Sequence, residues 1–188
     1  KVLEIASNNG LYLEKFQARG CTVLGIEPAQ NIAELALESG VSTWPVFFDS
    51  QAATDIRTKW GQADLVCARH VFAHIDDWQS LIANLETITH ERSLVALEVP
   101  YLVDFFEKTE FDTIYHEHLR YYSLSSLKYL FNRYNLKIIH AKKINTHGGS
   151  IRVYATKSKK FKINRNVNKI LKKEKKFLNW KTFNNFKK

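Results

Sequence analysis

The sequence predicts one α/β domain built on a doubly wound, mostly parallel sheet with helices on both faces. Three observations indicate this class. Short apolar runs alternate with amphipathic segments, one inner run is apolar without interruption, and a 188-residue chain is long enough for one full core. The composition, with 45% hydrophobic and 25% charged residues, excludes collagen-like and wholly disordered proteins.

Seven apolar runs are predicted as the strands of this sheet. Within the fifth, Leu94–Leu97 has no polar interruption, which is typical of a strand covered on both faces, and Pro100 ends it. The strands are expected at Val2–Ala6, Thr22–Ile26, Val46–Phe48, Ala63–Ala68, Ser93–Val99, Leu136–Ile139 and Ile151–Ala155.

The segments between the strands show helical spacing. The strongest signal lies between Asp77 and Thr89, where apolar residues recur at i, i+3, i+4, i+7 and i+10, and Asp76 or Asp77 is placed to cap this helix. Residues 101–122 are a polar, aromatic-rich insertion without clear periodicity. Other helices are expected before Gly20, between Ile32 and Gly40, and around Leu127–Tyr134.

The positive charge is concentrated at the end of the chain. Lys157–Lys188 contains thirteen Lys and Arg residues and one acid, Glu174, whereas the rest of the chain is mildly acidic. Apolar residues between the lysines fall near helical spacing, which favours a solvated amphipathic helix, with a nucleic acid or membrane surface as the alternative partner. We therefore divide the chain into a domain at 1–157 and a basic helical segment at 158–188, expected to begin a further lobe.

Several protein classes are excluded or disfavoured by composition. No apolar run approaches the roughly 18 residues that a membrane span needs, and no signal-peptide pattern opens the chain. Two cysteines, Cys21 and Cys67, are too few for a disulfide framework or a four-cysteine zinc site, which favours a cytoplasmic protein. The absence of Met and the start at Lys1 lead us to expect a piece of a longer protein.

Candidate ligand-binding residues follow the strands, because ligands of open α/β sheets bind at the carboxyl ends of the strands. The first strand leads into a turn with the small residue Ala6 and with Gly10, which lets the backbone approach a ligand. The second strand ends at Glu27, an acid suited to hold a ribose diol. Asp49 is expected either to face an adenine amino group or to cap the next helix.

The turn favours S-adenosylmethionine over a dinucleotide. A dinucleotide site needs three glycines for its pyrophosphate, and this turn has one. Its amide and hydroxyl side chains, with Glu4 and Glu27, suit a ligand that carries positive charge and no phosphate. The expected cofactor-binding residues are Glu4, Ala6, Ser7, Asn8, Gly10, Glu27, Pro28, Asp49, Arg69 and His70.

A cluster of titratable side chains lies in the insertion, at Tyr115, His116, Glu117 and His118. Histidine suits a general base because its ordinary pKa lies near neutral pH. A metal site formed with His74 is an alternative, although the spacing matches no metalloprotease helix, and solvated loop residues are another. We expect no metal in this chain.

The motifs VLEIASNNG, VLGIEPAQNIAELA, FAHIDD, EFDTIYHEHLRYYS and THGGSIR resemble the sugar C-methyltransferases, from Val2 to about Ala155. These are bacterial class I enzymes with a Rossmann-like fold that use S-adenosylmethionine to methylate a carbon of nucleotide-linked ketodeoxysugars. The first two motifs are general to class I methyltransferases, whereas the last two are more specific to the sugar C-methyltransferases. The family usually has Asp where Asn9 stands, and it carries an upstream zinc lobe and a downstream lobe that this sequence lacks or cuts short.

The resemblance implies roles for the cluster. His118 falls on the family's catalytic base, which forms an enolate from the ketosugar, while Tyr115, Glu117 and His74 line the same pocket. We expect His74 or Tyr115 to stabilise the enolate oxygen and Glu117 to orient a histidine or bind sugar hydroxyls. The substrate is expected to contact His116, Tyr121 and His147.

Two other functions stay open. An O- or N-methyltransferase of another small molecule would need no enolising base. A methyltransferase-like domain that binds RNA through its basic end is the alternative of a different class, and it leaves the histidine cluster unexplained. The sequence does not determine the oligomeric state.

Overall fold

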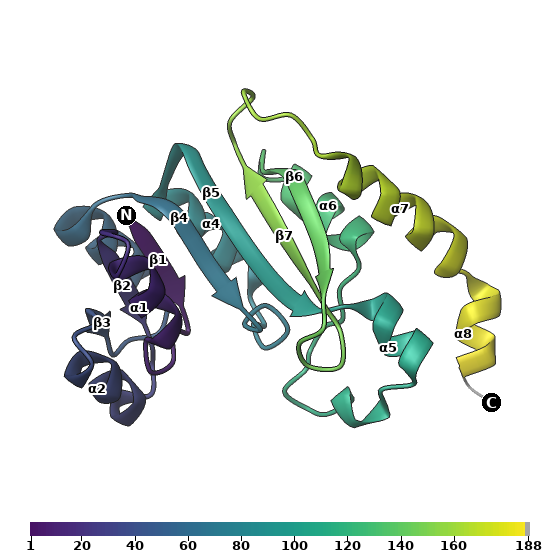
Figure 1. Ribbon diagram of the computed structural model, residues 1–188, viewed down its shortest axis with the longest axis horizontal. Helices are drawn as coiled ribbons and strands as arrows, with labels where there is room; N and C mark the ends of the chain where they lie inside the picture. Colours follow the sequence, from purple (N-terminus) through teal and green to yellow (C-terminus); the bar gives the residue numbers. More distant parts are fainter. Residues whose placement is uncertain (187–188) are drawn as a thin grey trace.

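In the computed structural model, which describes residues 1–186, seven strands form one sheet in the order β3-β2-β1-β4-β5-β7-β6 (Figure 1). β1 to β5 are parallel, and β7 runs antiparallel between β5 and β6. The predicted doubly wound sheet is therefore confirmed. The strands are β1 Val2–Ile5, β2 Val23–Ile26, β3 Thr43–Trp44, β4 Ala63–Arg69, β5 Thr89–Pro100, β6 Lys137–Ile144 and β7 Ser150–Thr156.

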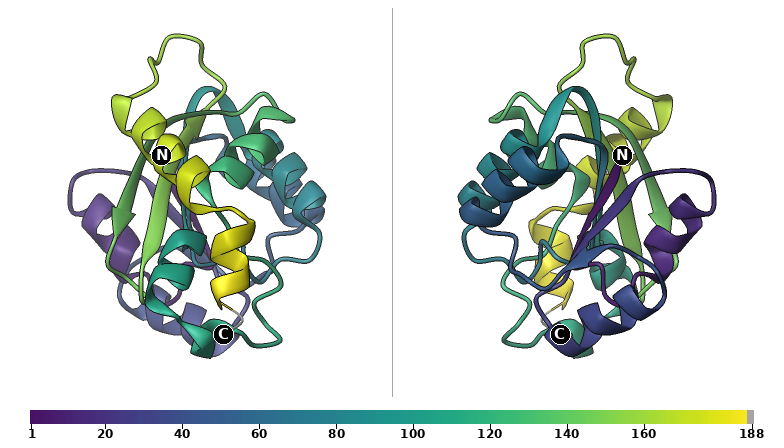
Figure 2. Two further views of the ribbon diagram at one scale, coloured as in Figure 1. Left: turned by 90° about the vertical axis from the view of Figure 1, so that its right-hand side faces the viewer. Right: turned by 90° about the vertical axis from the view of Figure 1, so that its left-hand side faces the viewer.

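Helices cover both faces of the sheet (Figure 2). A smaller core packs α1 and α2 on one face through Leu13 and Ala36, and a larger core packs α3, α4, α6 and α7 on the other. The helical segments are α1 Leu11–Gln17, α2 Gln30–Glu38, α3 Ser50–Asp55, η1 Ile56–Trp60, α4 Trp78–Ile88, α5 Leu102–Lys108, η2 Phe111–Thr113, α6 Leu124–Asn132, α7 Arg165–Phe177 and α8 Trp180–Phe186.

The helix with the strongest periodic signal forms as predicted. α4 spans Trp78–Ile88 and buries Leu81, Ile82, Leu85 and Ile88. Asp77 is its N-cap, and Oδ1 of Asp77 accepts a hydrogen bond from the Ser80 amide at 3.0 Å. An acid at this position satisfies a backbone N–H that would otherwise lack a partner within the helix.

The predicted third strand is wrong in position. The strand is Thr43–Trp44, two residues upstream of the apolar run, and 46–48 is a loop. Phe47 is 74% exposed and only Phe48 packs against the core, so most of this run is apolar without being buried. Short apolar runs do not distinguish a strand from a loop whose side chains face a cavity. The insertion is also more regular than expected, because it contains α5 and η2.

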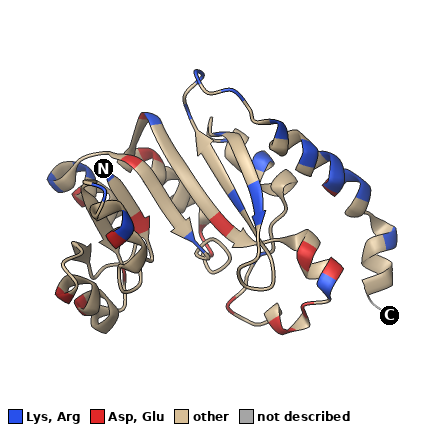
Figure 3. Ribbon diagram, in the orientation of Figure 1, with Lys and Arg blue, Asp and Glu red and all other residues tan. Residues whose placement is uncertain are grey.

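The basic segment packs on the domain through one side of α7, while its lysines line the other side (Figure 3). Val167 and Glu174 are the buried residues of this helix. Oε1 of Glu174 accepts hydrogen bonds from Tyr101 Oη at 2.9 Å and from the Leu124 amide at 2.6 Å. Oε2 accepts the Ser125 amide at 2.8 Å. This carboxylate therefore caps the first turn of α6 and links α7 to the sheet domain.

A second buried carboxylate lies in the sheet at Glu4, whose side chain is fully buried. Arg69 Nε donates to Oε1 at 2.7 Å, whereas Oε2 has no hydrogen-bond partner among the described residues. Burial raises the pKa of Glu4 to about 7, against the opposing effect of Arg69. The folded protein therefore holds this proton at pH values where the unfolded chain has released it.

We predict that Glu174→Ala lowers the free energy of unfolding by about 3 kcal/mol, because buried donors at the start of α6 lose a charged acceptor. Urea unfolding followed by circular dichroism measures the change. The exposed Lys175 provides the matched control on the same helix, and Lys175→Ala should change stability by less than about 0.5 kcal/mol. Equal effects of the two substitutions would contradict the role of Glu174.

We predict that stability depends on pH through Glu4. Between pH 4.5 and about 7 the folded state binds more protons than the unfolded chain, so the free energy of unfolding falls as the pH rises. Glu4→Gln removes this loss, which amounts to roughly 3 kcal/mol across the interval. As the pH rises from 4.5 to about 7, unfolding curves should show the wild type losing stability relative to Glu4→Gln. A difference in the free energy of unfolding that stays constant over this interval would contradict the prediction.

Candidate active site

The site lies where β1 and β4 leave the sheet side by side and the chain continues in opposite directions, because β2 follows on one side and β5 on the other. Loops at the carboxyl ends of such strands diverge and open a crevice. Two adjoining cavities fill this region. We call the first, of about 430 Å³, the strand-end cavity, and the second, of about 420 Å³, the histidine cavity.

The loop after β1 begins the strand-end cavity. Ala6 and Asn8 have left-handed backbone conformations, with φ of 52° and 53°. Gly10 follows with φ of 79°, and a Cβ there would lie 3.0 Å from the Cβ of Val41. Gly10 is thus required by its conformation and by packing against the segment after α2, and it does not itself line the cavity.

Glu27 is held at the mouth of the strand-end cavity by two backbone amides. Its Oε2 accepts from the Asn8 amide at 2.9 Å, and its Oε1 accepts from the Ala29 amide at 3.0 Å. The residue is 8% exposed. Each carboxylate oxygen keeps acceptor capacity beyond its one hydrogen bond, so the group is fixed in position and still suited to bind a diol.

One wall of the same cavity is apolar. Phe47 and Phe48 from the loop after β3 line it together with Val71 and Ile75 from the loop after β4. An exposed aromatic ring facing apolar side chains provides a slot for a flat ring system. The mispredicted third strand therefore contains part of the site.

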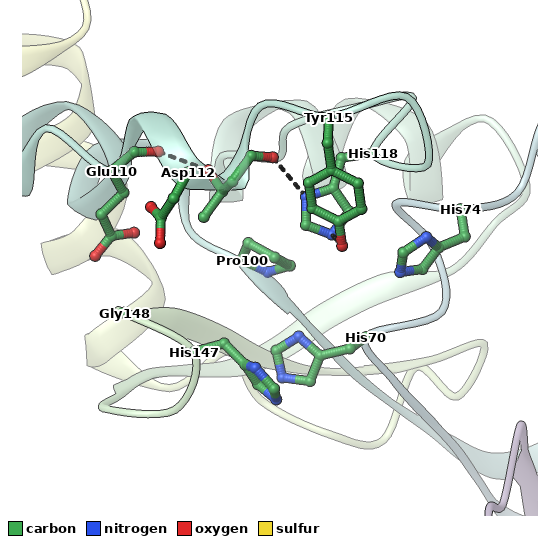
Figure 4. A pocket seen from close by; sticks show the side chains of 10 residues that line it. His70, His74, Pro100, Glu110, Asp112, Tyr115, His118, His147 and Gly148 are labelled. Atoms are coloured by element: carbon green, nitrogen blue, oxygen red, sulfur yellow. Dashed lines mark hydrogen bonds between the residues drawn. The ribbon is translucent and has the colours of Figure 1, made fainter.

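The histidine cavity is formed by the loop after β4, the insertion and the loop before β7. Figure 4 shows Tyr115 and His118 on one wall and His70 and His147 on the opposite wall. Its outer end carries the carboxylates of Glu110 and Asp112. The cavity is therefore rich in groups that accept or donate protons.

His118 is held in one orientation. Its Nδ1 lies 2.8 Å from the Thr113 carbonyl oxygen, which requires a proton on Nδ1. In the neutral ring Nε2 is then an acceptor, and it lies 3.0 Å from Tyr115 Oη. The backbone carbonyl thus presents the basic nitrogen of His118 to the cavity, next to a phenol.

His74 is oriented in the same way by a backbone carbonyl. Its Nδ1 lies 3.0 Å from the carbonyl oxygen of Glu117, and its ring centroid is 5.0 Å from that of His118. His74 and His70 line both cavities. The two cavities are therefore adjacent, and a ligand in one can meet a ligand in the other.

The structure brings together most of the expected cofactor-binding residues. The strand-end cavity is lined by Ala6, Asn8, Glu27, Pro28, Arg69 and His70. Four others lie outside its lining: Glu4, Ser7, Gly10 and Asp49. Glu4 is buried beneath Arg69, and Ser7 is buried with its Oγ unpartnered among the described residues. Asp49 caps α3 by accepting the Ala52 amide at 2.8 Å, the role that we gave as its alternative.

The predicted catalytic and substrate residues divide into three groups. Tyr115, His118, His74 and His147 line the histidine cavity. The side chains of His116 and Glu117 are 89% and 63% exposed and border only a wider opening beside it. Tyr121 lies behind the wall, where its Oη donates to the Thr113 carbonyl at 2.8 Å. Tyr121 thus supports the carbonyl that orients His118.

Sequence reasoning missed several residues of the site. Phe47 and Phe48 were assigned to a strand, and Thr113 gave no signal because its backbone oxygen makes the contact. Glu98 is a different case. It is an acid in an otherwise apolar strand, buried and in contact with His70. A charged residue in a strand covered on both faces is the signal that could have identified it.

Two features are absent from the described residues 1–186. No group of three or more His, Cys, Asp or Glu side chains is arranged to hold a metal ion. None of the helices within this range combines the length and the apolar character required to span a membrane. The two cysteines are free thiols.

The chain is similar to known methyltransferases. The curated C-methyltransferase NovU from Streptomyces niveus is 40% identical over 154 residues, which make up 82% of this chain and 37% of NovU. The chain thus spans little more than a third of the length of this relative. A family model described as a methyltransferase domain matches residues 1–141.

Solved structures share the fold at low sequence identity. A SAM-dependent methyltransferase from Archaeoglobus fulgidus superposes with a TM-score of 0.67 at 14% identity, over 82% of this chain and 85% of that one. Magnesium protoporphyrin IX methyltransferase from Synechocystis PCC 6803, solved with bound SAM, gives 0.61 at 12% identity, over 84% and 69%. With the family model matching from β1 into β6, the chain belongs to the methyltransferase domain family.

Proposed function

We propose that this chain is the core of an S-adenosylmethionine-dependent methyltransferase that methylates a carbon of a nucleotide-linked ketodeoxysugar, with His118 as the base. One observation carries the proposal. A cavity with a fixed carboxylate and an apolar slot adjoins a cavity into which an oriented imidazole presents its basic nitrogen. The similarity to the C-methyltransferase NovU supports carbon as the acceptor, and the Tyr-His-Glu-His and His-Gly-Gly-Ser segments support a sugar.

The residues of the strand-end cavity fit an adenosine that carries a sulfonium. Glu27 offers two fixed acceptor oxygens for the ribose hydroxyls, and Phe47, Phe48, Val71 and Ile75 offer a slot for the adenine ring. The loop after β1 has one glycine and no array suited to a pyrophosphate. When bound, S-adenosylmethionine supplies a methyl group that its sulfonium already activates.

The histidine cavity provides the base. A ketone makes the neighbouring C–H acidic, and His118 Nε2 takes that proton while the Thr113 carbonyl holds Nδ1–H. Tyr115 Oη lies 3.0 Å from the same nitrogen and must move its hydrogen bond to the substrate before the base can act. The carbon keeps the electron pair with which it forms the new bond to the methyl group.

We predict that Glu27→Gln weakens the binding of S-adenosylmethionine at least tenfold, because the amide keeps one acceptor oxygen and brings an NH₂ donor against one of the two backbone amides. Isothermal titration calorimetry with the whole chain measures the affinity. Glu34, exposed on α2, provides the matched control: Glu34→Gln should leave the affinity unchanged. Equal affinities of both variants would contradict the placement of the ribose.

We predict that His118→Gln abolishes proton removal while cofactor binding persists. Proton removal is measured on a panel of nucleotide-linked 4-ketosugars, as the exchange of hydrogen for deuterium at the carbon beside the ketone. Methyl transfer to the same sugars is measured by mass spectrometry with a labelled methyl group. We expect a loss of about 10² to 10⁴ in rate, the usual contribution of a general base.

The control is His90→Gln, because His90 pairs with Asp64 at the other end of the strands and lies outside both cavities. This variant should exchange at the wild-type rate. Normal methyl transfer by His118→Gln would instead indicate an acceptor oxygen or nitrogen, which needs no carbon acid.

A further inference from the structure

A buried carboxylate lies directly beneath the junction of the two cavities. The Glu98 side chain, on β5, is 5% exposed, and its Oε1 is 3.2 Å from His70 Nε2 and accepts from Thr146 Oγ1 at 3.0 Å. Its Oε2 accepts from Arg152 Nε at 2.8 Å and lies 2.7 Å from Nη2. Although burial alone acts in the opposite direction, hydrogen bonds from His70 and Arg152 lower the pKa of Glu98 to about 2.

This contact fixes the proton on one nitrogen of His70. An ionised carboxylate only accepts hydrogen bonds, so Nε2 of His70 carries a proton toward Glu98. Nδ1 of His70 then has no hydrogen-bond partner among the described residues. Since the ring lines both cavities, Nδ1 is the nitrogen available to a ligand.

The backbone and a neighbouring ring also hold His70 in place. Its φ of 56° is left-handed, which costs energy for a residue other than glycine, and its amide donates to the Glu98 carbonyl at 2.8 Å. The His147 ring packs against it with centroids 4.2 Å apart. His70 is therefore a positioned group and not a freely rotating surface side chain.

His70 differs from the other imidazoles that line the histidine cavity. His74 and His118 each have Nδ1 against a backbone carbonyl, and neither ring has a carboxylate partner among the described residues. Burial, and after it the charge of the neighbouring His70 ring, lower the pKa of His147, which favours its neutral form. Of these four rings, all within the described residues, His70 is the one whose cation has a carboxylate partner.

The proposed reaction needs such a cation. When a base removes the proton beside a ketone, negative charge develops on the ketone oxygen, and a fixed donor at that oxygen lowers the barrier. Resting on the proposed function, we propose that His70 is a further catalytic residue: as an imidazolium held by Glu98, it donates its Nδ1–H to the ketone oxygen while His118 takes the carbon proton. Glu98 is a positioning residue in this arrangement.

The step balances without any further reactant. The C–H bond breaks, its proton moves to His118, and the electron pair makes an enolate whose oxygen the His70 Nδ1–H stabilises. The pair then forms the C–CH₃ bond as the methyl group leaves the donor sulfur, and the carbonyl is restored. His70 keeps its proton throughout.

The first test measures the charge of His70 and needs neither substrate nor donor. NMR titration of the histidine-labelled whole chain, assigned with His70→Asn, compares wild type with Glu98→Gln. The charged groups around His70 are Glu98 and Arg152 from the strands, Arg69 beside it, and the rings of His74, His118 and His147. Loss of the carboxylate leaves Arg152 unopposed, so His70 should release its proton at a lower pH than in wild type.

A matched control exists in a second histidine–carboxylate pair. His90 Nε2 lies 3.1 Å from Asp64 Oδ1, outside both cavities. Asp64→Asn should change the titration of His90 and leave that of His70 unchanged. An identical His70 titration in wild type and in Glu98→Gln would overturn the proposal.

The second test measures catalysis through deuterium exchange beside the ketone of nucleotide-linked 4-ketosugars. We expect His70→Gln to lower kcat about 100-fold and KM to change little, because the donor acts as charge develops. The rate of Glu98→Gln should begin to fall at a lower pH than the rate of wild type. This difference in pH should equal the difference between the His70 titrations of the two proteins. Glu98→Asp, which keeps the charge, should restore part of the rate, whereas Asp64→Asn should behave as wild type.

The outcomes separate this inference from the proposed function. Full exchange by His70→Gln, with none by His118→Gln, would leave the proposed function standing and overturn the role of His70. No exchange by wild type on any ketosugar would overturn both. Thermal unfolding checks that each variant folds, and His70→Gln decides the question where Glu98→Gln does not fold.

Discussion

The divergence of the chain at the carboxyl ends of β1 and β4 is the constraint on which the site depends. The two strands are paired in register, with Ile5 beside Ala68, yet the next strand lies to one side after β1 and to the other after β4. The loops that follow cannot close over each other, and both cavities lie in the space between them. Glu27 from β2 and His70 from β4 reach the same crevice because parallel strands end at the same edge of the sheet.

Backbone groups do much of the positioning in this crevice. Two amides hold the Glu27 carboxylate, and the carbonyls of Thr113 and Glu117 orient His118 and His74. Backbone groups are held by the fold, so they position side chains at little further cost in conformational entropy. This explains how the loop after β4 and the insertion present imidazole nitrogens in defined orientations.

Three buried carboxylates illustrate different solutions to the cost of burying charge. Glu98 and Glu174 have donors on both oxygens, and for Glu98 these hydrogen bonds hold the pKa low despite burial. Glu4 has one donor and a second oxygen without a described partner, and its pKa rises accordingly. A carboxylate remains charged in the interior where hydrogen bonds replace its lost hydration.

Local patterns in the sequence determined the sheet, the strongest helix and its cap at Asp77, because apolar periodicity and capping act over a few residues. They also placed Glu27 and His118 at strand ends and in the insertion. Only the tertiary structure decided that 46–48 is a loop facing a cavity, that the His116 side chain faces solvent, and that Glu98 contacts His70 and Arg152. Those contacts join residues 28 and 54 positions apart, so they follow from strand order and register, which no short stretch of sequence encodes.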